Sequence, residues 1–306
     1  MKYIFSALLT MFFFSSVFAQ EEYIFNQYFL NPATINPGAV GFDGNHNILF
    51  NYRNTWAGFP DAPRTFAAHY NGEVADNVGI GGYLLSDNYA SLTSLRGSAS
   101  FAYTIKGENY DIGVGISAQY QQYGINNNVL TSQFTDQNDP ELLRRLDNGQ
   151  FFEAALGAHG KLSSGLFFDI ALPGLVRARI SDTNTQDESP AQFNYLLGVG
   201  YPFQIASYDM IVEPSIYIKK FRNIPMHVDI NALMRFLDSR LLSGITYSRG
   251  ADNRLGFLIG TQINTLRFNY SYNITFHESQ QFNNGGHEIG LGLVIDPRKP
   301  MKDKEL

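Results

Sequence analysis

The sequence contains no cysteine and little charge: 16% of its 306 residues are Asp, Glu, Lys or Arg, against roughly a quarter in ordinary soluble domains. The absence of cysteine excludes disulfides, thiolate metal sites, a cysteine nucleophile and a lipid anchor on an N-terminal cysteine. The six histidines show no close metal-ligand spacing, and no Gly-x-Ser-x-Gly nucleophile frame is present. The sequence therefore predicts a protein that is not an enzyme and that uses no metal or other cofactor.

Basic charge and long apolar runs are also scarce. The formal net charge is −6, whereas a nucleic-acid partner would need a basic stripe. The one long apolar run, residues 3–18, follows Lys2 and precedes the small residue Ala19. It is shorter than the ~20 apolar residues that a spanning helix needs. These features predict a signal peptide over residues 1–19, export from the cytoplasm and no nucleic-acid partner.

Aromatic residues and glycine are abundant instead, with 25 Phe, 18 Tyr and 28 Gly. From residue 47 onward, apolar and polar residues alternate with the period of a β-strand. Leu266, Phe268 and Tyr270 share one face, for example, and Arg267 and Asn269 lie on the other. A soluble β-sandwich and a membrane barrel both give this alternation. Many of the segments exceed the roughly 5–6 residues of an ordinary strand and reach the roughly 9–11 residues of a membrane strand, which favours the barrel.

The pattern predicts fourteen strands, over residues 47–53, 64–71, 77–86, 91–105, 109–123, 150–161, 165–172, 191–201, 209–220, 226–236, 240–248, 253–263, 264–276 and 286–295. Counted along the chain, the two longest connections, 124–149 and 173–190, are the fifth and the seventh. When both termini of a bacterial barrel are periplasmic, the odd-numbered connections lie outside and are the longer ones. We therefore expect an all-β fold, a transmembrane antiparallel β-barrel of about 14 strands (12–16) in the cell outer membrane. The barrel would cover residues 47–296, and a charged periplasmic tail would cover residues 297–306.

Residues 20–46, between the signal peptide and the barrel, form an irregular segment rich in proline. Its two Asn-Pro steps, Asn31-Pro32 and Asn36-Pro37, predict rigid turns, because proline fixes φ and restricts the preceding residue. Lipid-exposed backbone must be fully hydrogen-bonded, and proline cannot donate. We therefore expect this segment to form a plug in the lumen or at the periplasmic rim.

A second stretch rich in proline follows the first strand and would lie at the outer mouth of the barrel. Its candidate functional residues are Trp56, Gly58, Phe59, Pro60 and Pro63. Two large apolar side chains on a loop stiffened by proline predict a lid or a partner-binding edge, and a membrane-interface anchor is the alternative. In the long connection 124–149, Asp139 and Pro140 also predict the start of a short helix over residues 139–146.

The polar faces of the expected strands carry charges of both signs. The alternation places these residues inside the barrel: Arg96, Glu213, Lys219, Asp229, Arg235 and Arg267. Unpaired charges are costly in a narrow space, so we expect a packed lumen with salt bridges, and a polar pore of weak selectivity is the alternative. The Gly-rich runs at residues 79–82 and 113–115 are interpreted as small lumen-facing positions rather than phosphate loops.

Several short motifs near the N-terminus resemble one family. They are Gln27-Tyr28, Asn31-Pro32-Ala33, Asn36-Pro37-Gly38 with Gly41, Tyr52-Arg53-Asn54 with Trp56, and Gly58-Phe59-Pro60. In this order they resemble the PorP/SprF family of outer-membrane proteins of the type IX secretion system of Bacteroidetes.

The resemblance implies an integral outer-membrane barrel that takes part in the secretion or surface display of large adhesins and in gliding motility. Besides outer-membrane lipid, its partner would be a secreted adhesin or another type IX component. The family-motif residues with an expected structural role are Asn31, Pro32, Asn36, Pro37, Gly38, Gly41, Tyr52 and Arg53. The alternative function is an outer-membrane porin or solute transporter.

Overall fold

The computed structural model describes residues 25–59, 61–89, 92–125, 149–180, 193–221, 225–250, 253–276 and 284–298. The expected signal peptide, the helix expected over residues 139–146, Pro60 and residues 299–306 lie outside the described residues. The strands are β1 (His46–Asn54), β2 (Arg64–Ala75), β3 (Val78–Tyr89), β4 (Leu92–Lys106), β5 (Tyr110–Ile125), β6 (Gln150–Leu162), β7 (Phe167–Arg179), β8 (Tyr195–Gly200), β9 (Phe203–Ile205), β10 (Met210–Lys220), β11 (His227–Phe236), β12 (Leu241–Arg249), β13 (Arg254–Ile263), β14 (Leu266–Thr275) and β15 (Gly286–Ile295).

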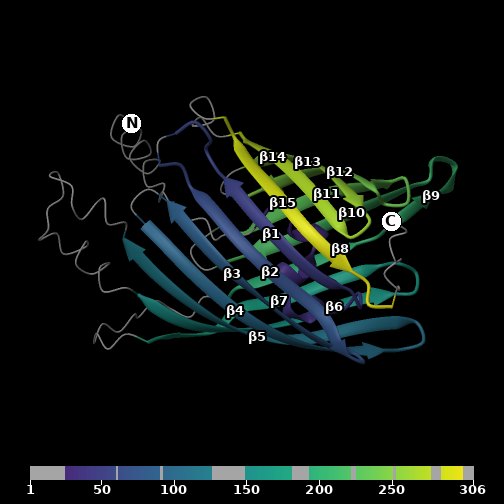
Figure 1. Cartoon of the computed structure of the whole chain (residues 1–306), viewed down its shortest axis with the longest axis horizontal. Helices are drawn as coiled ribbons and strands as arrows, with labels where there is room; N and C mark the ends of the chain where they lie inside the picture. Colours follow the sequence, from purple (N-terminus) through teal and green to yellow (C-terminus); the bar gives the residue numbers. More distant parts are fainter. Residues whose placement is uncertain are drawn as a thin grey trace, which may run out of the picture.

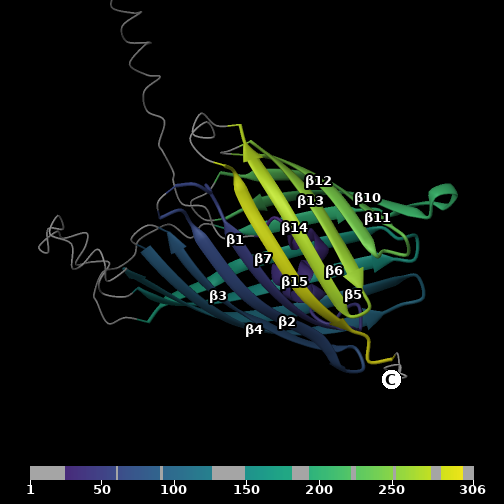
Figure 2. The same ribbon diagram turned by 45° about the horizontal axis from the view of Figure 1, so that its top comes forward.

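These strands form one closed antiparallel sheet, in which neighbours in sequence pair and β1 pairs with β15 (Figures 1 and 2). The short segments β8 and β9 both pair with β10 and are separated by Tyr201 and Pro202. Proline has no backbone N–H for the ladder, so one strand is interrupted there rather than two strands formed. The pairing of β10 with β11 closes the sheet. The structure therefore confirms a barrel of fourteen strands.

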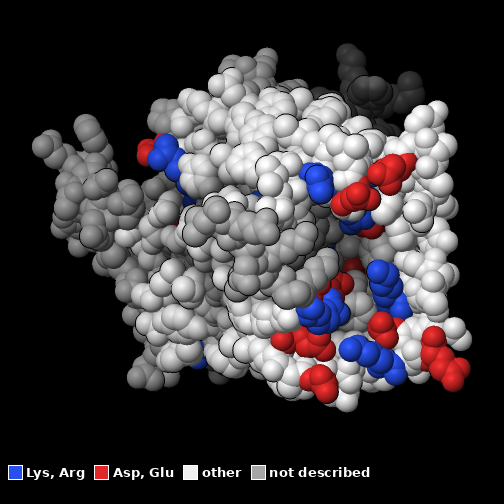
Figure 3. Space-filling view, turned by 45° about the vertical axis from the view of Figure 1, so that its right-hand side comes forward, with Lys and Arg blue, Asp and Glu red and all other residues white. Residues whose placement is uncertain are grey.

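The alternation in the sequence separates the two surfaces of the barrel as predicted. On β14, Phe268 is 46% exposed and its neighbour Asn269 only 2%. Large apolar side chains point outward along the other strands too, as a lipid-facing wall requires. Figure 3 shows that the flank of the barrel is nearly free of charge, whereas acidic and basic side chains are interspersed at the end with the short connections. Within the described residues, no helix is both long enough and apolar enough to cross a bilayer.

The seventh strand is longer than the sequence predicts. It was expected over residues 165–172 but runs as β7 to Arg179, and the next strand starts at Tyr195 rather than residue 191. The pair Pro173-Gly174 looks like a strand end in the sequence. Instead, Gly174 adopts a φ of 59°, and the extra residues form a bulge opposite Ala154–Leu156, where the register shifts. The prediction of the boundary was wrong because a bulge bends a strand without ending it.

The connections sort by length between the two ends of the barrel. Those at one end are short, and Asn77 and Asn264 make their turns in the left-handed region. At this end β1 begins and β15 ends, with His46 opposite Ile295. The long connections leave from the opposite end, which is the outer end in the orientation of bacterial barrels.

Candidate functional site

The N-terminal segment lies inside the barrel, as expected. Three short 3-10 turns, η2 (Tyr28–Leu30), η3 (Pro32–Thr34) and η4 (Pro37–Ala39), follow one another through the lumen, and a fourth, η5 (Ala206–Tyr208), lies between β9 and β10. Pro32 and Pro37 occupy the first positions of η3 and η4, where a missing N–H costs nothing. The segment satisfies part of its backbone locally, for example by the bond of 2.9 Å from the Asn36 N–H to the Pro32 carbonyl. We call residues 25–45 the lumenal segment.

The first contact that fixes the lumenal segment is with Glu288 on β15. This carboxylate is fully buried and accepts hydrogen bonds from the backbone N–H groups of Asn26 (2.9 Å) and Gln27 (3.1 Å). The Gln27 side chain also donates to the Glu288 carbonyl oxygen. Arg53, which lies opposite Glu288 in the β1–β15 register, is buried and faces the lumen. Tyr52 points outward instead and is 42% exposed, so the two neighbouring motif residues serve opposite faces of the wall.

The second contact joins Tyr28 to Asp229 on β11. The Tyr28 hydroxyl donates to the Asp229 carboxylate at 2.8 Å, and the Lys219 ammonium lies 2.6 Å from the same carboxylate and 4.7 Å from the centre of the Tyr28 ring. Burial and the Asp229 charge raise the pKa of Tyr28 well above its usual value, so the phenol keeps its proton as a donor. The Tyr28 ring also packs edge-on against Tyr217 at 5.0 Å.

The third contact joins Asn36 to Asp169 on β7. The Asn36 amide donates to the Asp169 carboxylate at 2.7 Å and to the Ala158 carbonyl at 2.9 Å, while its oxygen accepts from the Gly38 N–H. His159 and the Tyr217 hydroxyl also hold Asp169, at 2.9 and 3.0 Å. Three wall carboxylates, from β15, β11 and β7, therefore accept hydrogen bonds from the lumenal segment and fix its position in the barrel.

Glycines on the wall let the lumenal segment approach closely. A Cβ on Gly113, Gly115 or Gly79 would fall on the backbone carbonyl of a residue of the lumenal segment, and a Cβ on Gly38 would lie 2.7 Å from the Ala158 Cα. This confirms that Gly79, Gly113 and Gly115, in the Gly-rich runs of β3 and β5, face the lumen. Gly41 adopts a φ of 70°, which only glycine takes without strain. The remaining motif residue of this segment, Asn31, accepts a hydrogen bond from the Asn71 amide at 3.4 Å.

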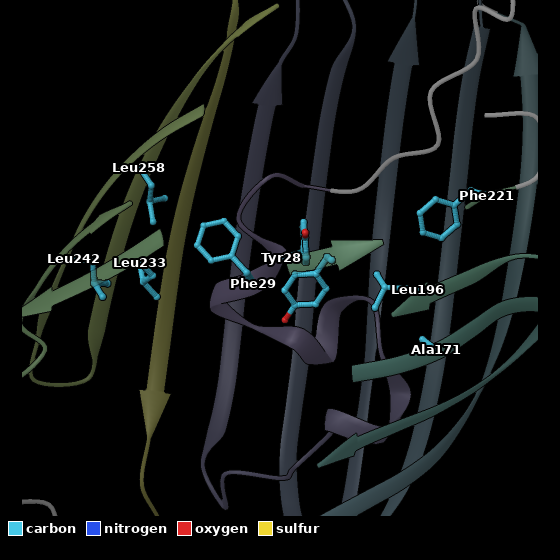
Figure 4. Packing of buried hydrophobic residues seen from close by; sticks show 9 residues of the cluster. Tyr28, Phe29, Ala171, Leu196, Phe221, Leu233, Leu242 and Leu258 are labelled. Atoms are coloured by element: carbon cyan, nitrogen blue, oxygen red, sulfur yellow. The ribbon is translucent and has the colours of Figure 1, made fainter. Parts of the chain in front are cut away.

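Apolar packing also holds the lumenal segment against the wall. Tyr28 and Phe29 of the lumenal segment lie among lumen-facing side chains of the wall, as Figure 4 shows. The buried wall members of this cluster are Ala171, Leu196, Tyr217, Phe221, Leu233, Leu242 and Leu258. The wall around Phe29 is therefore apolar, unlike the polar wall that a water-filled pore requires.

Most of the lumen charges that the sequence analysis named form ion pairs or hydrogen bonds. Arg235 and Glu213 form an ion pair at 2.6 Å, whereas Arg267 donates to the Gln262 amide oxygen at 3.0 and 3.2 Å. Arg96 is buried beside the Gln121 amide. With the amide oxygen turned toward Arg96, this oxygen accepts hydrogen bonds from the guanidinium at 2.8 and 3.1 Å.

Sequence reasoning assigned no role to Asp169 and Glu288, two of the carboxylates that hold the lumenal segment. Asp169 is a single acid between the apolar residues Phe168 and Ile170 on a lumen-facing position, and this was the available signal; Glu288 lies between His287 and Ile289.

The loop at the outer mouth is held by backbone hydrogen bonds. The Thr55 N–H donates to the carbonyl of the buried Pro63 at 3.0 Å, and the Ala57 N–H donates to the Gly285 carbonyl at 2.9 Å. Gly58 has a φ of 98°, which permits the sharp turn. Trp56 packs against Tyr89 at 5.8 Å between ring centres, yet stays 39% exposed.

Phe59, three residues after Trp56, is 43% exposed. The two aromatic side chains therefore form an accessible apolar edge, which we call the mouth edge. Among the described residues, no group of three His, Asp or Glu side chains has the arrangement of a metal site.

A closed antiparallel barrel with an apolar flank and an occupied lumen defines an integral outer-membrane β-barrel protein. The chain belongs to the PorP/SprF family: the family model described as "Type IX secretion system membrane protein PorP/SprF" matches residues 17–293. The family and the fold are those of a secretion-associated barrel of the outer membrane rather than of a known class of enzyme.

The chain is similar to several solved outer-membrane proteins at low sequence identity. The outer membrane protein Omp33 of Acinetobacter baumannii is 9% identical, with 83% of this chain and 99% of that chain covered and a TM-score of 0.46. CdiB from Acinetobacter baumannii is 9% identical, with coverages of 82% and 60% and a TM-score of 0.47. A mutant of the TodX monoaromatic hydrocarbon channel is 10% identical, with coverages of 85% and 91% and a TM-score of 0.43. No curated protein matches the chain.

Proposed function

We propose that this protein supports the secretion or surface display of type IX substrates such as large adhesins, as a partner or anchor in the outer membrane. The observation that carries the proposal is the lumenal segment, seated on three wall carboxylates and on wall glycines. A segment seated in the lumen narrows the path for solutes, and it braces a wall that presents its outer mouth to a partner. Membership of the PorP/SprF family supports a partner from the type IX secretion system.

The mouth edge is the surface that we assign to the partner. Trp56 and Phe59 are large, exposed and held in place by backbone bonds, and side chains of this kind dominate the binding energy of many interfaces. A membrane anchor is the competing role, since aromatic residues also gather where a barrel meets the lipid headgroups.

Replacing Trp56 and Phe59 together by alanine is expected to abolish surface display of the cognate adhesin without changing the amount of assembled barrel. Display is measured by antibody labelling of intact cells, and assembly by the heat-dependent mobility of the barrel in outer-membrane fractions. Phe66→Ala is the matched control, because Phe66 is a lipid-facing aromatic of β2 that is 51% exposed. Normal display in the double variant would remove the mouth edge from the proposal.

Conductance distinguishes the proposal from the porin alternative. In planar bilayers, the purified protein is expected to show no steady current, because the lumenal segment packs against wall residues of several strands inside the barrel. A steady pore whose current saturates with a particular solute would instead establish a transporter. The same preparation should then fail to recover an adhesin or a secretion component from native membranes.

A further inference from the structure

The lumen contains a cavity on the outer side of the lumenal segment. It offers about 110 Å³ to water-sized molecules, and residues 33–37 of the lumenal segment form one side of its lining. Residues of the strands from β2 to β7 form the other side. A Cβ on Gly115 would fall on the Pro37 carbonyl, and Ser117, the next lumen-facing residue of β5 toward the outer end, belongs to the lining. The cavity therefore begins where the contact between β5 and the lumenal segment ends.

The strand side of the cavity carries a row of polar side chains. Matching register positions on β3, β4, β5 and β6 are occupied by Tyr83, Ser98, Gln119 and Glu153, which all line the cavity. The Tyr83 hydroxyl donates to the Gln119 amide oxygen, and the Gln119 amide donates to Glu153 at 3.3 Å. Arg177 pairs with the other oxygen of Glu153 at 3.2 Å. These bonds hold the row in a fixed arrangement before a ligand arrives, which favours binding.

Serine hydroxyls extend this row toward the periplasmic end. Ser100 and Ser117 lie opposite each other in the β4–β5 register, one lumen-facing position beyond the pair of Ser98 and Gln119. All three serines line the cavity. Because a hydroxyl group both donates and accepts hydrogen bonds, the wall offers groups of both kinds to a bound molecule.

The row continues onto β2 with a polar atom that lacks a partner. His69 lies opposite Tyr83 in the β2–β3 register, lines the cavity and is 7% exposed. Its ring packs near those of Phe25 and Tyr83, with 6.1 and 5.5 Å between the ring centres. Among the described residues, none forms a hydrogen bond with its Nε2, and a buried polar atom in this state is costly. A small rotation of the ring would turn this nitrogen toward a ligand hydroxyl in the cavity.

The charges of the lining select a neutral ligand. Its carboxylate, Glu153, already pairs with Arg177, and its cation, Arg96, is buried beside the Gln121 amide. A charged ligand would therefore lose water without gaining a counter-ion that is not already engaged. An apolar ligand would leave the hydroxyl and amide groups of the lining without partners. A neutral molecule with several hydroxyl groups satisfies the lining best.

The size and the aromatic members of the lining narrow this class further. A cavity of about 150 Å³ accommodates a six-membered ring of carbon atoms, so the present cavity suits a small polyol or the terminal part of one sugar ring. The rings of Tyr83 and Phe221 belong to the same lining, and Figure 4 labels Phe221. Such rings offer an apolar surface to the carbon skeleton of a sugar while the hydroxyl groups meet the polar row.

We propose that this cavity is a binding site for a neutral polyhydroxylated ligand, either a free small polyol or sugar or the terminal unit of a longer glycan. The site goes beyond the proposed function, because it needs no secreted partner. Its recognition groups are the serine hydroxyls, the Gln119 amide and His69.

Titration calorimetry of the purified full chain tests the ligand class. The detergent must carry no sugar head group, and the probes are glycerol, glucose, glucosamine and glucuronate. Glycerol and glucose are expected to bind saturably at one site, and the two charged sugars at least roughly tenfold more weakly than glucose. Absence of saturable binding by glycerol and by glucose overturns the site. Binding of either charged sugar as tightly as glucose overturns the neutral class.

Variants of the serines test whether the cavity is the place of binding. Replacing Ser100 and Ser117 together by valine removes two hydroxyls and adds methyl groups to the cavity, so glucose binding is expected to weaken at least about tenfold. Thr104→Val is the matched control, because Thr104 is a buried hydroxyl residue of the same strand as Ser100 and lies outside the lining. It should leave binding unchanged.

Heat-dependent mobility verifies that these variants assemble. If the double variant does not, Ser117→Ala removes one hydroxyl without adding volume and should weaken glucose binding severalfold. Unchanged binding in the serine variants that assemble would overturn the assignment to this cavity.

Maltotriose, which ends in one glucose unit, distinguishes the two sources of the ligand. Binding as tight as that of glucose, weakened by the same serine variants, indicates the terminal unit of a longer glycan. Binding at least about tenfold weaker than that of glucose indicates a free solute. Both results support the site, whereas maltotriose binding that the serine variants leave unchanged overturns it for glycans.

Discussion

Replacing Gly113 by valine is expected to open the barrel, with a steady single-channel current where the wild-type protein shows none. Gly113 faces the lumen on β5, and any Cβ there would fall on the carbonyl oxygen of Gly38. A backbone atom of a seated turn cannot move aside as a flexible side chain can, and overpacking of this kind costs about 1–3 kcal/mol or more. Valine itself favours a strand, so the wall should still form. The variant should therefore keep its barrel, but its lumenal segment should no longer pack against the wall in its native position.

Gly97→Val is the matched control for this experiment. Gly97 lies on β4, and a Cβ there would meet only the Leu84 side chain, at an ordinary 3.4 Å. This variant should remain closed. Exchange rates of the amides of residues 26–40 provide a second measurement, because they should rise in Gly113→Val only. A closed Gly113→Val barrel would show that the lumenal segment does not depend on the glycine positions of the wall.

Replacing Ile259 by arginine is expected to lower the free energy of unfolding in lipid vesicles by about 2–4 kcal/mol, the usual cost of a lipid-facing charge at the bilayer midplane. Ile259 lies in the middle of β13 and is 60% exposed. Ile263→Arg is the control on the same strand and face, because Ile263 ends β13 and is 65% exposed. There the cost should fall to about 0–1 kcal/mol, since the arginine reaches the headgroups. Equal costs at both positions, measured by denaturant titration, would contradict the membrane placement of the barrel.

Much of the fold was predictable because a barrel wall obeys a local rule. Each strand alternates between lipid and lumen, so Phe268 and Asn269 could be assigned to opposite faces from their parity. The missing N–H of Pro32 and Pro37 excluded the Asn-Pro turns from the lipid-facing wall and left the lumen or the periplasmic rim, between which the structure decides for the lumen. The strand end predicted at residue 172 failed because Pro173-Gly174 allows two outcomes, a turn or a bulge. The pairing with β6 decides between them.

The candidate site was less predictable. The sequence named Asn36 and Asp229 separately, but it gave no reason to join Asn36 to Asp169, a contact between residues 133 positions apart. Glu288 contacts the Gln27 N–H across 261 positions, and no local periodicity contains such a distance. Closure of the sheet by β1 with β15 and by β10 with β11 determines which wall residues surround the lumenal segment.

By itself, the sequence determined the class of protein, the number of strands, the face of each residue and the presence of an irregular segment that had to leave the wall. These follow from the period of the strand and from the demand that lipid-exposed backbone be hydrogen-bonded. Only the tertiary structure decided that three carboxylates hold that segment and that β7 continues through a bulge past Pro173-Gly174. The reason is physical: register and closure fix these contacts, and both depend on the whole ring of strands rather than on any one of them.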